Sequence, residues 1–238
     1  MTSLATLPAL AAATTDDPEP PSRPSHPPLI HRLQGGQQMT ADLFTALDNK
    51  GFELVAGVVQ EKAMSAYSDA FQTWLIMFLA MAADEFGGNI AGPEGGLRCF
   101  ADPNTIRKPD FAWTAPDRLQ PLPEYGWTEV APTFAIEVLS PRNTVKEIAE
   151  KVALFLAAGV EMVWVIDPLK LVATVHTKKG SAEYDASTPL PSPLPTLQLT
   201  LQQVADKANR GATRAVPPAD PPANTAGTTD PERSEESA

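Results

Sequence analysis

The stretches KPDFAW (residues 108–113) and FAIEVLSP (residues 134–141) carry the strongest fold signal in this chain. Both are typical of apolar β-strands, and each places one acidic residue among hydrophobic neighbours. A carboxylate in a buried strand is costly unless a partner charge or a metal compensates it. Because two such carboxylates on neighbouring strands would supply oxygen ligands for one hard cation, Asp110 and Glu137 together suggest a magnesium site.

The order of the other elements follows from hydrophobic periodicity and turn residues. We expect a short helix at residues 40–48, with Thr40 as its N-cap, and a strand pair at residues 53–61 that turns at Ala56-Gly57. The longest helix, residues 68–86, is apolar nearly throughout, so it should be buried on most sides. Strands are expected at residues 96–101, 106–114, 133–139, 162–166 and 171–177. A long polar loop covers residues 115–131.

A capping box predicts the helix that follows the 133–139 strand. Thr144 is followed by Glu147 at the third position after it, and Gly159 ends the apolar pattern. The expected order is thus a helix, a strand pair, a long helix, several strands, a helix and further strands. The predicted fold class is α/β (or α+β), with a mixed central sheet flanked by helices.

Three segments differ in composition. Residues 1–38 are rich in proline and alanine and lack periodic apolar residues, so we expect a disordered N-terminal extension. Residues 39–207 form the expected folded domain. Residues 208–238 have the composition of a disordered tail.

Composition restricts the functional classes. The chain has 18 Lys and Arg residues against 29 Asp and Glu residues, a formal charge of −11, which argues against tight non-specific binding to DNA. With a single cysteine, Cys99, and three histidines, a cysteine- or histidine-based metal site is not expected, and carboxylates remain as metal ligands. No apolar run is long enough to span a membrane, and the N-terminus lacks the basic start of a signal peptide, so we expect a cytoplasmic protein.

The series of motifs resembles the PD-(D/E)XK nuclease superfamily and, more closely, the Uma-two family of predicted restriction endonucleases. The resemblance covers roughly residues 39–207. It is carried by MTA (39–41), ELVAG (53–57), PD (109–110), IEVLSP (136–141), EK (150–151), AAGV (157–160) and VWVIDP (163–168).

This resemblance implies a restriction-endonuclease-like fold and a hydrolase that cleaves phosphodiester bonds in DNA, with Mg²⁺, or alternatively Mn²⁺, as its cofactor. By position, Asp110 and Glu137 would be catalytic metal ligands, and Glu53 would be a supporting acid. The superfamily's lysine is expected two residues after Glu137, but Leu139 stands there. In the family the lysine appears on the next helix, where Lys151 is the matching residue.

Lys146 is the competing candidate on that helix. Other positions depart from the family pattern: Ala56 stands where an acid is usual, Val58 or Val59 where another is frequent, and Ser68 or Asp69 where a histidine often opens the long helix. These departures leave a catalytically impaired nuclease-fold module, used for binding or interaction, as the alternative function. A structural homo-oligomer built on the long helix is a second alternative, and a homodimer is compatible with either reading.

Each candidate residue also has a simpler interpretation. Asp110 could be a hydrogen-bonded aspartate at a strand end, Lys151 a solvated residue paired with Glu147, and Glu53 a partner of Lys50 or Lys62. Arg107 and Lys108 could contact phosphate, but an exposed, solvated basic pair is the simpler expectation. Trp127 could stack on a base, yet it more simply anchors its loop. Cys99 reads as a small core residue, and His176 is assigned no role.

Overall fold

The computed structural model describes residues 38–62 and 65–213, and for residues 210–213 it describes the backbone alone. The predicted disorder of residues 1–37 and 214–238 therefore lies outside the described residues. Within the described range no helix is long and apolar enough to cross a membrane.

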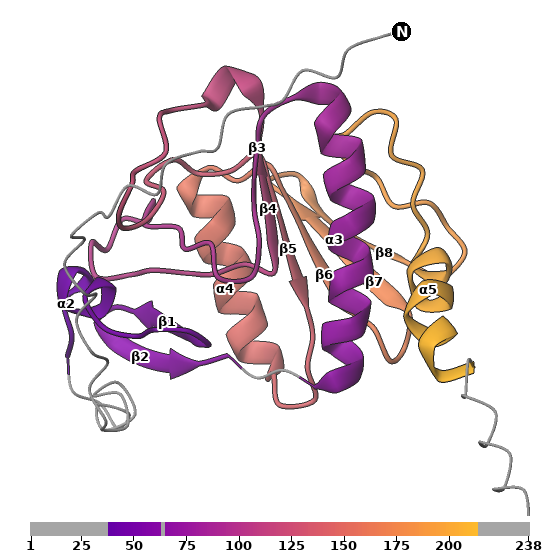
Figure 1. Cartoon of the computed structure of the whole chain (residues 1–238), viewed down its shortest axis with the longest axis horizontal. Helices are drawn as coiled ribbons and strands as arrows, with labels where there is room; N and C mark the ends of the chain where they lie inside the picture. The colour runs from indigo at the N-terminus through magenta and orange to yellow at the C-terminus, as the bar shows by residue number, and fades with distance from the viewer. Residues whose placement is uncertain (1–37, 63–64, 214–238) are drawn as a thin grey trace, which may run out of the picture.

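A six-stranded mixed sheet forms the centre of the molecule (Figure 1). Its strands lie in the order β3-β4-β5-β6-β7-β8. Their bounds are Asn89–Ala91, Phe111–Thr114, Phe134–Val138, Met162–Asp167, Val172–Thr177 and Gly180–Tyr184. Only β5 and β6 pair in parallel, because the helix α4 (Val145–Ala158) connects them by a crossover, whereas hairpins and loops join the other neighbours antiparallel.

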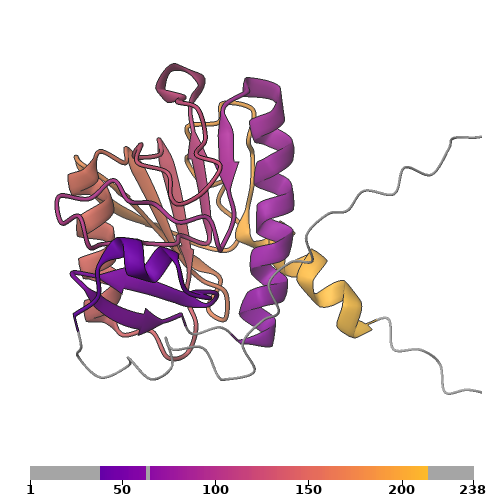
Figure 2. The same ribbon diagram turned by 60° about the vertical axis from the view of Figure 1, so that its left-hand side comes forward.

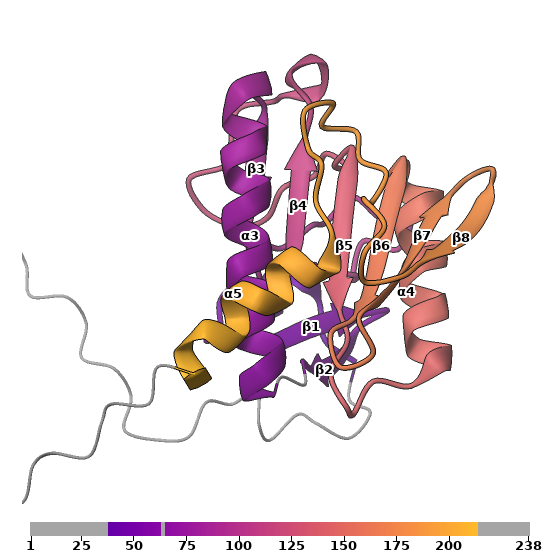
Figure 3. The same cartoon turned by 90° about the vertical axis from the view of Figure 1, so that its right-hand side faces the viewer.

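Helices cover both faces of this sheet (Figures 2 and 3). The long helix α3 (Ala66–Phe86) and the C-terminal helix α5 (Leu201–Thr213) lie on one face, and α4 lies on the other. Strand β5 shows why both faces are apolar. Its residues Phe134, Ile136 and Val138 pack in the core beneath α3 and α5, whereas Ala135 packs with α4. Glu137 follows Ala135 at the strand period of two, so its side chain belongs to the α4 face.

A small hairpin next to the main sheet completes the fold. It consists of β1 (Phe52–Val55) and β2 (Val58–Glu61), preceded by the short helix α2 (Ala41–Thr45). The two turn residues, Ala56 and Gly57, have positive φ angles of 47° and 79°, as expected for a two-residue type I′ turn. Leu54 exchanges backbone hydrogen bonds of 3.0 and 2.7 Å with Ile106, so the hairpin is attached to the segment that leads into β4.

Most predicted elements are present. Thr40 caps α2, the strand pair turns at Ala56-Gly57, Thr144 and Glu147 form the capping box, and Gly159 ends α4. A turn at residues 102–105 precedes the segment that leads into β4, with the backbone N–H of Thr105 donating to the carbonyl of Asp102 at 3.1 Å. The predicted fold class is confirmed: a mixed α/β sheet flanked by helices.

Two strand predictions are wrong, one in the existence of the strand and the other in its first residue. Residues 96–101 form no strand, and Leu97 makes only isolated bridges. The strand predicted at residues 106–114 begins only at Phe111, because Ile106 and Arg107 pair with the hairpin and with Leu97 instead of the main sheet. The first segment and the start of the second are largely buried although they lie outside the main sheet, so their local residue pattern does not distinguish a strand from an irregular buried segment.

The helices differ from the predictions as well. α2 ends at Thr45, before residue 48, and α3 buries one face only, with Met77 and Met81 exposed. α5 was missed altogether, and it continues to Thr213, beyond the predicted domain boundary at residue 207. Strands β3 and β8 were also missed, since β3 has three residues and β8 is mostly exposed.

Candidate active site

Asp110 and Glu137 lie opposite each other across two antiparallel strands. Phe111 pairs with Ile136 in the register of β4 and β5, so the residue before Phe111 comes opposite the residue after Ile136. Opposite residues of an antiparallel pair project from the same face of the sheet. The carboxylate Oδ2 of Asp110 also accepts the backbone N–H of Val138 at 2.7 Å, which fixes its orientation beside the end of β5. Both acids are buried, with exposed fractions of 3% and 5%.

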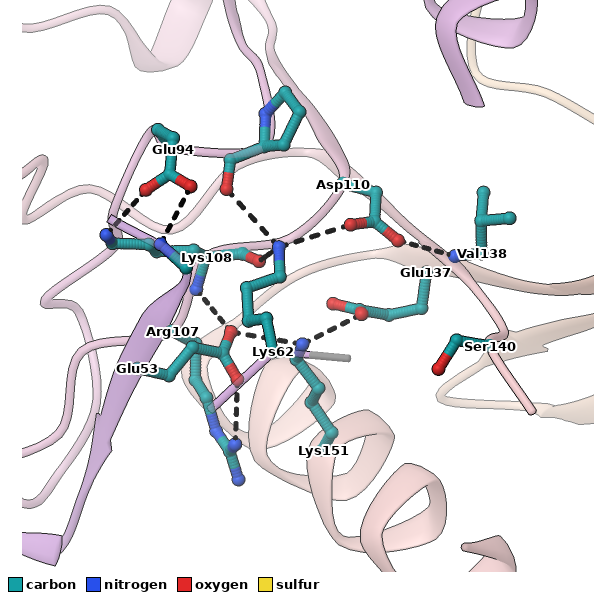
Figure 4. Close-up of polar contacts among 12 residues, drawn as sticks. Glu53, Lys62, Glu94, Arg107, Lys108, Asp110, Glu137, Val138, Ser140 and Lys151 are labelled. Carbon is teal, nitrogen blue, oxygen red and sulfur yellow. Dashed lines mark hydrogen bonds and ion pairs between the residues drawn. The ribbon is translucent and has the colours of Figure 1, made fainter. Parts of the chain in front are cut away.

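Lys151 reaches the same place from the following helix (Figure 4). Its Nζ lies 2.8 Å from Oε2 of Glu137 and 3.0 Å from Oε1 of Glu53. Lys151, Val152 and Phe155 form the buried side of α4, so the lysine lies on the face that packs against the sheet. The simpler interpretation of Lys151 as a solvated partner of Glu147 is therefore wrong. Its competitor Lys146 is exposed and lies 3.8 Å from Glu150.

Glu53 comes from the hairpin and joins the site through three contacts. Its Oε1 accepts the backbone N–H of Lys108 at 2.6 Å as well as the Lys151 ammonium, and its Oε2 pairs with Arg107 at 3.2 Å. The bridge between Leu54 and Ile106 places it there. The predicted alternative, a pair with Lys50 or Lys62, is not seen.

Lys62 also belongs to the site, although its place in the sequence does not predict this. Its ammonium lies 3.1 Å from Oδ1 of Asp110 and donates to the backbone carbonyls of Lys108 at 2.7 Å and Pro93 at 3.2 Å (Figure 4). Lys62 follows the exposed end of β2, and no motif there predicts a contact with Asp110. Only the pairing of the hairpin with the segment before β4 brings it to Asp110.

Arg107 and Lys108 are buried, which corrects the expectation of an exposed basic pair. The Lys108 ammonium contacts Asn49 at 2.8 and 2.9 Å and the Glu94 carboxylate at 2.7 Å. It also lies over the rings of Phe44 and Trp127, at 5.9 and 5.3 Å from their centroids. This cation–π cage holds Lys108 away from any phosphate, while its backbone N–H and C=O contact Glu53 and Lys62.

Trp127 thus anchors its loop. Its Nε1 donates to Oγ1 of Thr45 at 2.5 Å, and its ring packs 6.2 Å from that of Phe44. Two positions that depart from the family pattern, Ala56 and Ser68, do not line the cavity that holds Asp110 and Glu137. Ala56 is exposed in the hairpin turn, and buried Ser68 donates to the carbonyl of Leu139 at 3.1 Å.

A cavity of about 380 Å³ opens onto these groups. Besides Glu53, Asp110, Glu137 and Lys151, it is lined by basic residues from three different segments: Lys62, Arg107 and Arg142. Acidic and basic side chains are mixed in its wall. The cavity therefore presents buried carboxylates and cations together, an arrangement in which each group's charge depends on the others.

The pKa values reflect this coupling. Burial raises the pKa of Glu137 to about 7; Asp110 and Glu53 act in the same direction, and Lys151 opposes them. Burial by itself would raise the pKa of Glu53 too, but the cations of Lys151 and Arg107 outweigh it and lower that pKa to about 2. Burial lowers the pKa of Lys151, yet the surrounding carboxylates raise it above its usual range.

The side chains at this cavity are of the kind that binds magnesium, although the described residues provide no complete metal cage. Among the described residues, no group of three or more His, Cys, Asp or Glu side chains is arranged to hold a metal. Magnesium, however, is commonly held by one or two carboxylates and keeps several waters. Oε1 of Glu137 is buried and has no hydrogen-bond partner in the described part of the chain, so one carboxylate oxygen beside Asp110 is free to bind a cation.

A mixed sheet flanked by helices is the arrangement of restriction-endonuclease-like folds, and here Asp110, Glu137 and Lys151 line one cavity beside it. The sequence profile of the Uma2 family, described as "Putative restriction endonuclease", matches residues 41–205. The chain belongs to this family.

A solved structure supports the same fold. A DUF820 protein from Anabaena variabilis, described as a putative nuclease, superposes with a TM-score of 0.62 at 19% sequence identity. The match covers 71% of this chain and 99% of that chain. At this sequence identity, the structural similarity is evidence for the fold alone. Curated proteins give no match to the chain.

Proposed function

We propose that the protein is a magnesium-dependent endonuclease that hydrolyses phosphodiester bonds in DNA. The observation that carries this proposal is the contact between Lys151 and Glu137 across 2.8 Å, in a cavity shared with Asp110. The lysine expected two residues after Glu137 is absent, and a lysine from the next helix supplies an ammonium at the same carboxylate. Family membership supports the reaction class.

Asp110 and Glu137 are the proposed metal ligands. Asp110 is oriented by the N–H of Val138, and Glu137 offers its Oε1, which has no hydrogen-bond partner among the residues that the structure describes. A magnesium ion held there would polarise the scissile phosphate and lower the pKa of a bound water. Its charge would also offset the acidic net charge of the chain at the place where phosphate has to approach.

Lys151 is proposed to orient the attacking water and to stabilise negative charge on the phosphate. Its ammonium is held between Glu137 and Glu53, so its position is set before a substrate arrives. Glu53 acts as the supporting acid: its Oε1 accepts from Lys151 and its Oε2 from Arg107. Glu53 is therefore a positioning residue.

A plasmid-nicking assay with Mg²⁺ and with Mn²⁺ tests this proposal. The wild type should nick supercoiled DNA, whereas Asp110→Asn and Lys151→Ala should lose at least about 100-fold of the rate, since each removes a group that acts in the transition state. Lys146→Ala, on the exposed face of the same helix, is the matched control and should keep wild-type activity. Cleavage that persists unchanged in Asp110→Asn would contradict the site assignment.

The alternative function is a nuclease-fold module that binds a partner without cleavage. The observation that favours it is the ion pair of Lys62 with Asp110, which places an ammonium on a proposed metal ligand. Thermal unfolding measured against Mg²⁺ and Mn²⁺ concentration separates the two. A metal-dependent rise in the melting temperature that Asp110→Ala abolishes supports the nuclease, and no rise in the wild type supports the module.

A further inference from the structure

The ammonium of Lys62 occupies a position lined by oxygen atoms. Three oxygens surround it: Oδ1 of Asp110 at 3.1 Å and the backbone carbonyl oxygens of Lys108 at 2.7 Å and Pro93 at 3.2 Å. Its side chain is only 13% exposed. The three donors of an ammonium are thus matched by three acceptors, two from residues 108–110 and one from Pro93, which makes this a built contact of the fold.

Carboxylate and carbonyl oxygens are also the ligands that hard divalent cations prefer. We propose that Lys62 is an internal competitor of the divalent cation for Asp110, and that its ammonium has to withdraw from Oδ1 when the cation binds. This inference rests on the proposed function, because it takes Asp110 as a metal ligand. Lys62 is then a positioning residue that sets the metal affinity of the site.

The two acids differ in how open they are to a cation. Both oxygens of Asp110 are engaged, Oδ1 by Lys62 and Oδ2 by the N–H of Val138. Glu137 pairs with Lys151 through Oε2 alone, and its Oε1 has no partner among the described residues. A cation can therefore reach Glu137 without displacing Lys151. To bind Asp110, a cation has to overcome the electrostatic repulsion of the Lys62 ammonium.

Charge repulsion gives the direction of the effect. A magnesium ion lies about 2.0–2.1 Å from a ligand oxygen, and the Lys62 ammonium lies 3.1 Å from Oδ1 of Asp110. Two positive groups on one carboxylate oxygen repel each other strongly in a buried site. Lys151 shares its charge between two carboxylates, Glu137 and Glu53, so it opposes the cation less.

Isothermal titration with MgCl₂ and with MnCl₂, each without DNA, measures the competition. Lys62→Met should bind either metal at least about tenfold more tightly than the wild type, the size of effect that a neighbouring charge has on a carboxylate. Lys62→Gln, whose amide can still donate to the two carbonyls, should show the same gain. Lys62→Arg keeps the charge and should stay near the wild type.

Lys50→Met is the matched control, because it removes the same charge from an exposed position in the same part of the chain. It should leave the metal affinity unchanged. Adding Asp110→Asn to Lys62→Met should abolish the gain, which a merely structural role of Lys62 would not predict. Chemical unfolding of each variant shows whether it is folded during the titration.

The outcomes distinguish this inference from the proposed function. Equal or weaker metal binding by both Lys62→Met and Lys62→Gln, when the wild type binds metal, overturns the competition alone. Tighter binding without DNA cleavage by any variant supports the competition and overturns the nuclease. No metal binding by the wild type or by either variant overturns both.

Discussion

Nζ of Lys151 lies 2.8 Å from Oε2 of Glu137, although the two residues are 14 positions apart and belong to the helix α4 and the strand β5. The strand β5 ends beside the start of α4, and the helix runs back over the sheet, so a residue about two turns into the helix returns to the strand's end. Because the contact is buried, both its chemistry and its stability can be tested by substitution.

Lys151→Met should destabilise the fold by about 3–5 kcal/mol, because it leaves the buried carboxylate of Glu137 without its ion-pair partner and deprives Glu53 of one of its cations. Urea unfolding at neutral pH measures the free energy change. The control Lys146→Met removes an exposed lysine with one weak contact and should change stability by less than about 0.5 kcal/mol. Equal effects of the two variants would contradict the buried pair.

Glu137→Gln should remove metal binding yet change stability by only about 1 kcal/mol at pH 8, since Lys151 keeps Glu53 as a partner. The pKa of Glu137 is raised from 4.5 to about 7, so its contribution is fully present below about pH 4.5 and is lost as the pH rises through about 7. The wild type should therefore lose stability over that window without metal.

In Glu137→Gln this decline should be absent. Denaturant titrations at several pH values between 4.5 and 8 provide the measurement, and Glu183→Gln, an exposed position on β8, provides the control. A decline of equal size in wild type and Glu137→Gln would show that another group is responsible.

Glu53 should make the free energy of unfolding fall as the pH becomes acidic. Its pKa is lowered from 4.5 to about 2, so its contribution is present above pH 4.5 and is lost as the pH falls toward 2. The shift corresponds to about 3 kcal/mol. Glu53→Gln should be less stable than the wild type at pH 6, and the difference should shrink as the pH approaches 2. A difference that stays constant with pH would contradict the lowered pKa.

Lys108→Met should destabilise the protein by about 2–3 kcal/mol, because it leaves Asn49 and Glu94 without the cation that joins them and removes the charge between Phe44 and Trp127. Unfolding monitored by circular dichroism gives the change. Lys178→Met, at an exposed position, is the control and should be near neutral. Nicking activity should fall as well if the Lys108 backbone holds Glu53 and Lys62 in place.

Much of the site could be anticipated from residue type and spacing. Asp110 and Glu137 stood out because an acid in an apolar strand requires compensation, and Lys151 followed from its place on the helix after that strand. The role of Lys62 could not be predicted, since it directly follows the exposed end of β2 and its partner Asp110 precedes β4, 48 positions later in the chain. The burial of Lys108 was missed for a related reason: its cage combines α2, the loop at Glu94 and Trp127, which are distant in sequence.

Elements with strong local signals could be read from the residues alone. Hydrophobic alternation, the capping box of Thr144 and Glu147 and the glycine at 159 specify β5, α4 and β6, and hence the parallel unit that carries Glu137 and Lys151. Which cation compensates which acid became apparent only from the packing of the folded chain. That choice depends on the bridge of Leu54 with Ile106 and on the register of β4 with β5, both of them long-range pairings set by packing and burial. The proposed metal ligand Asp110 is thus a local feature of the sequence, whereas its contact with Lys62 is a property of the fold.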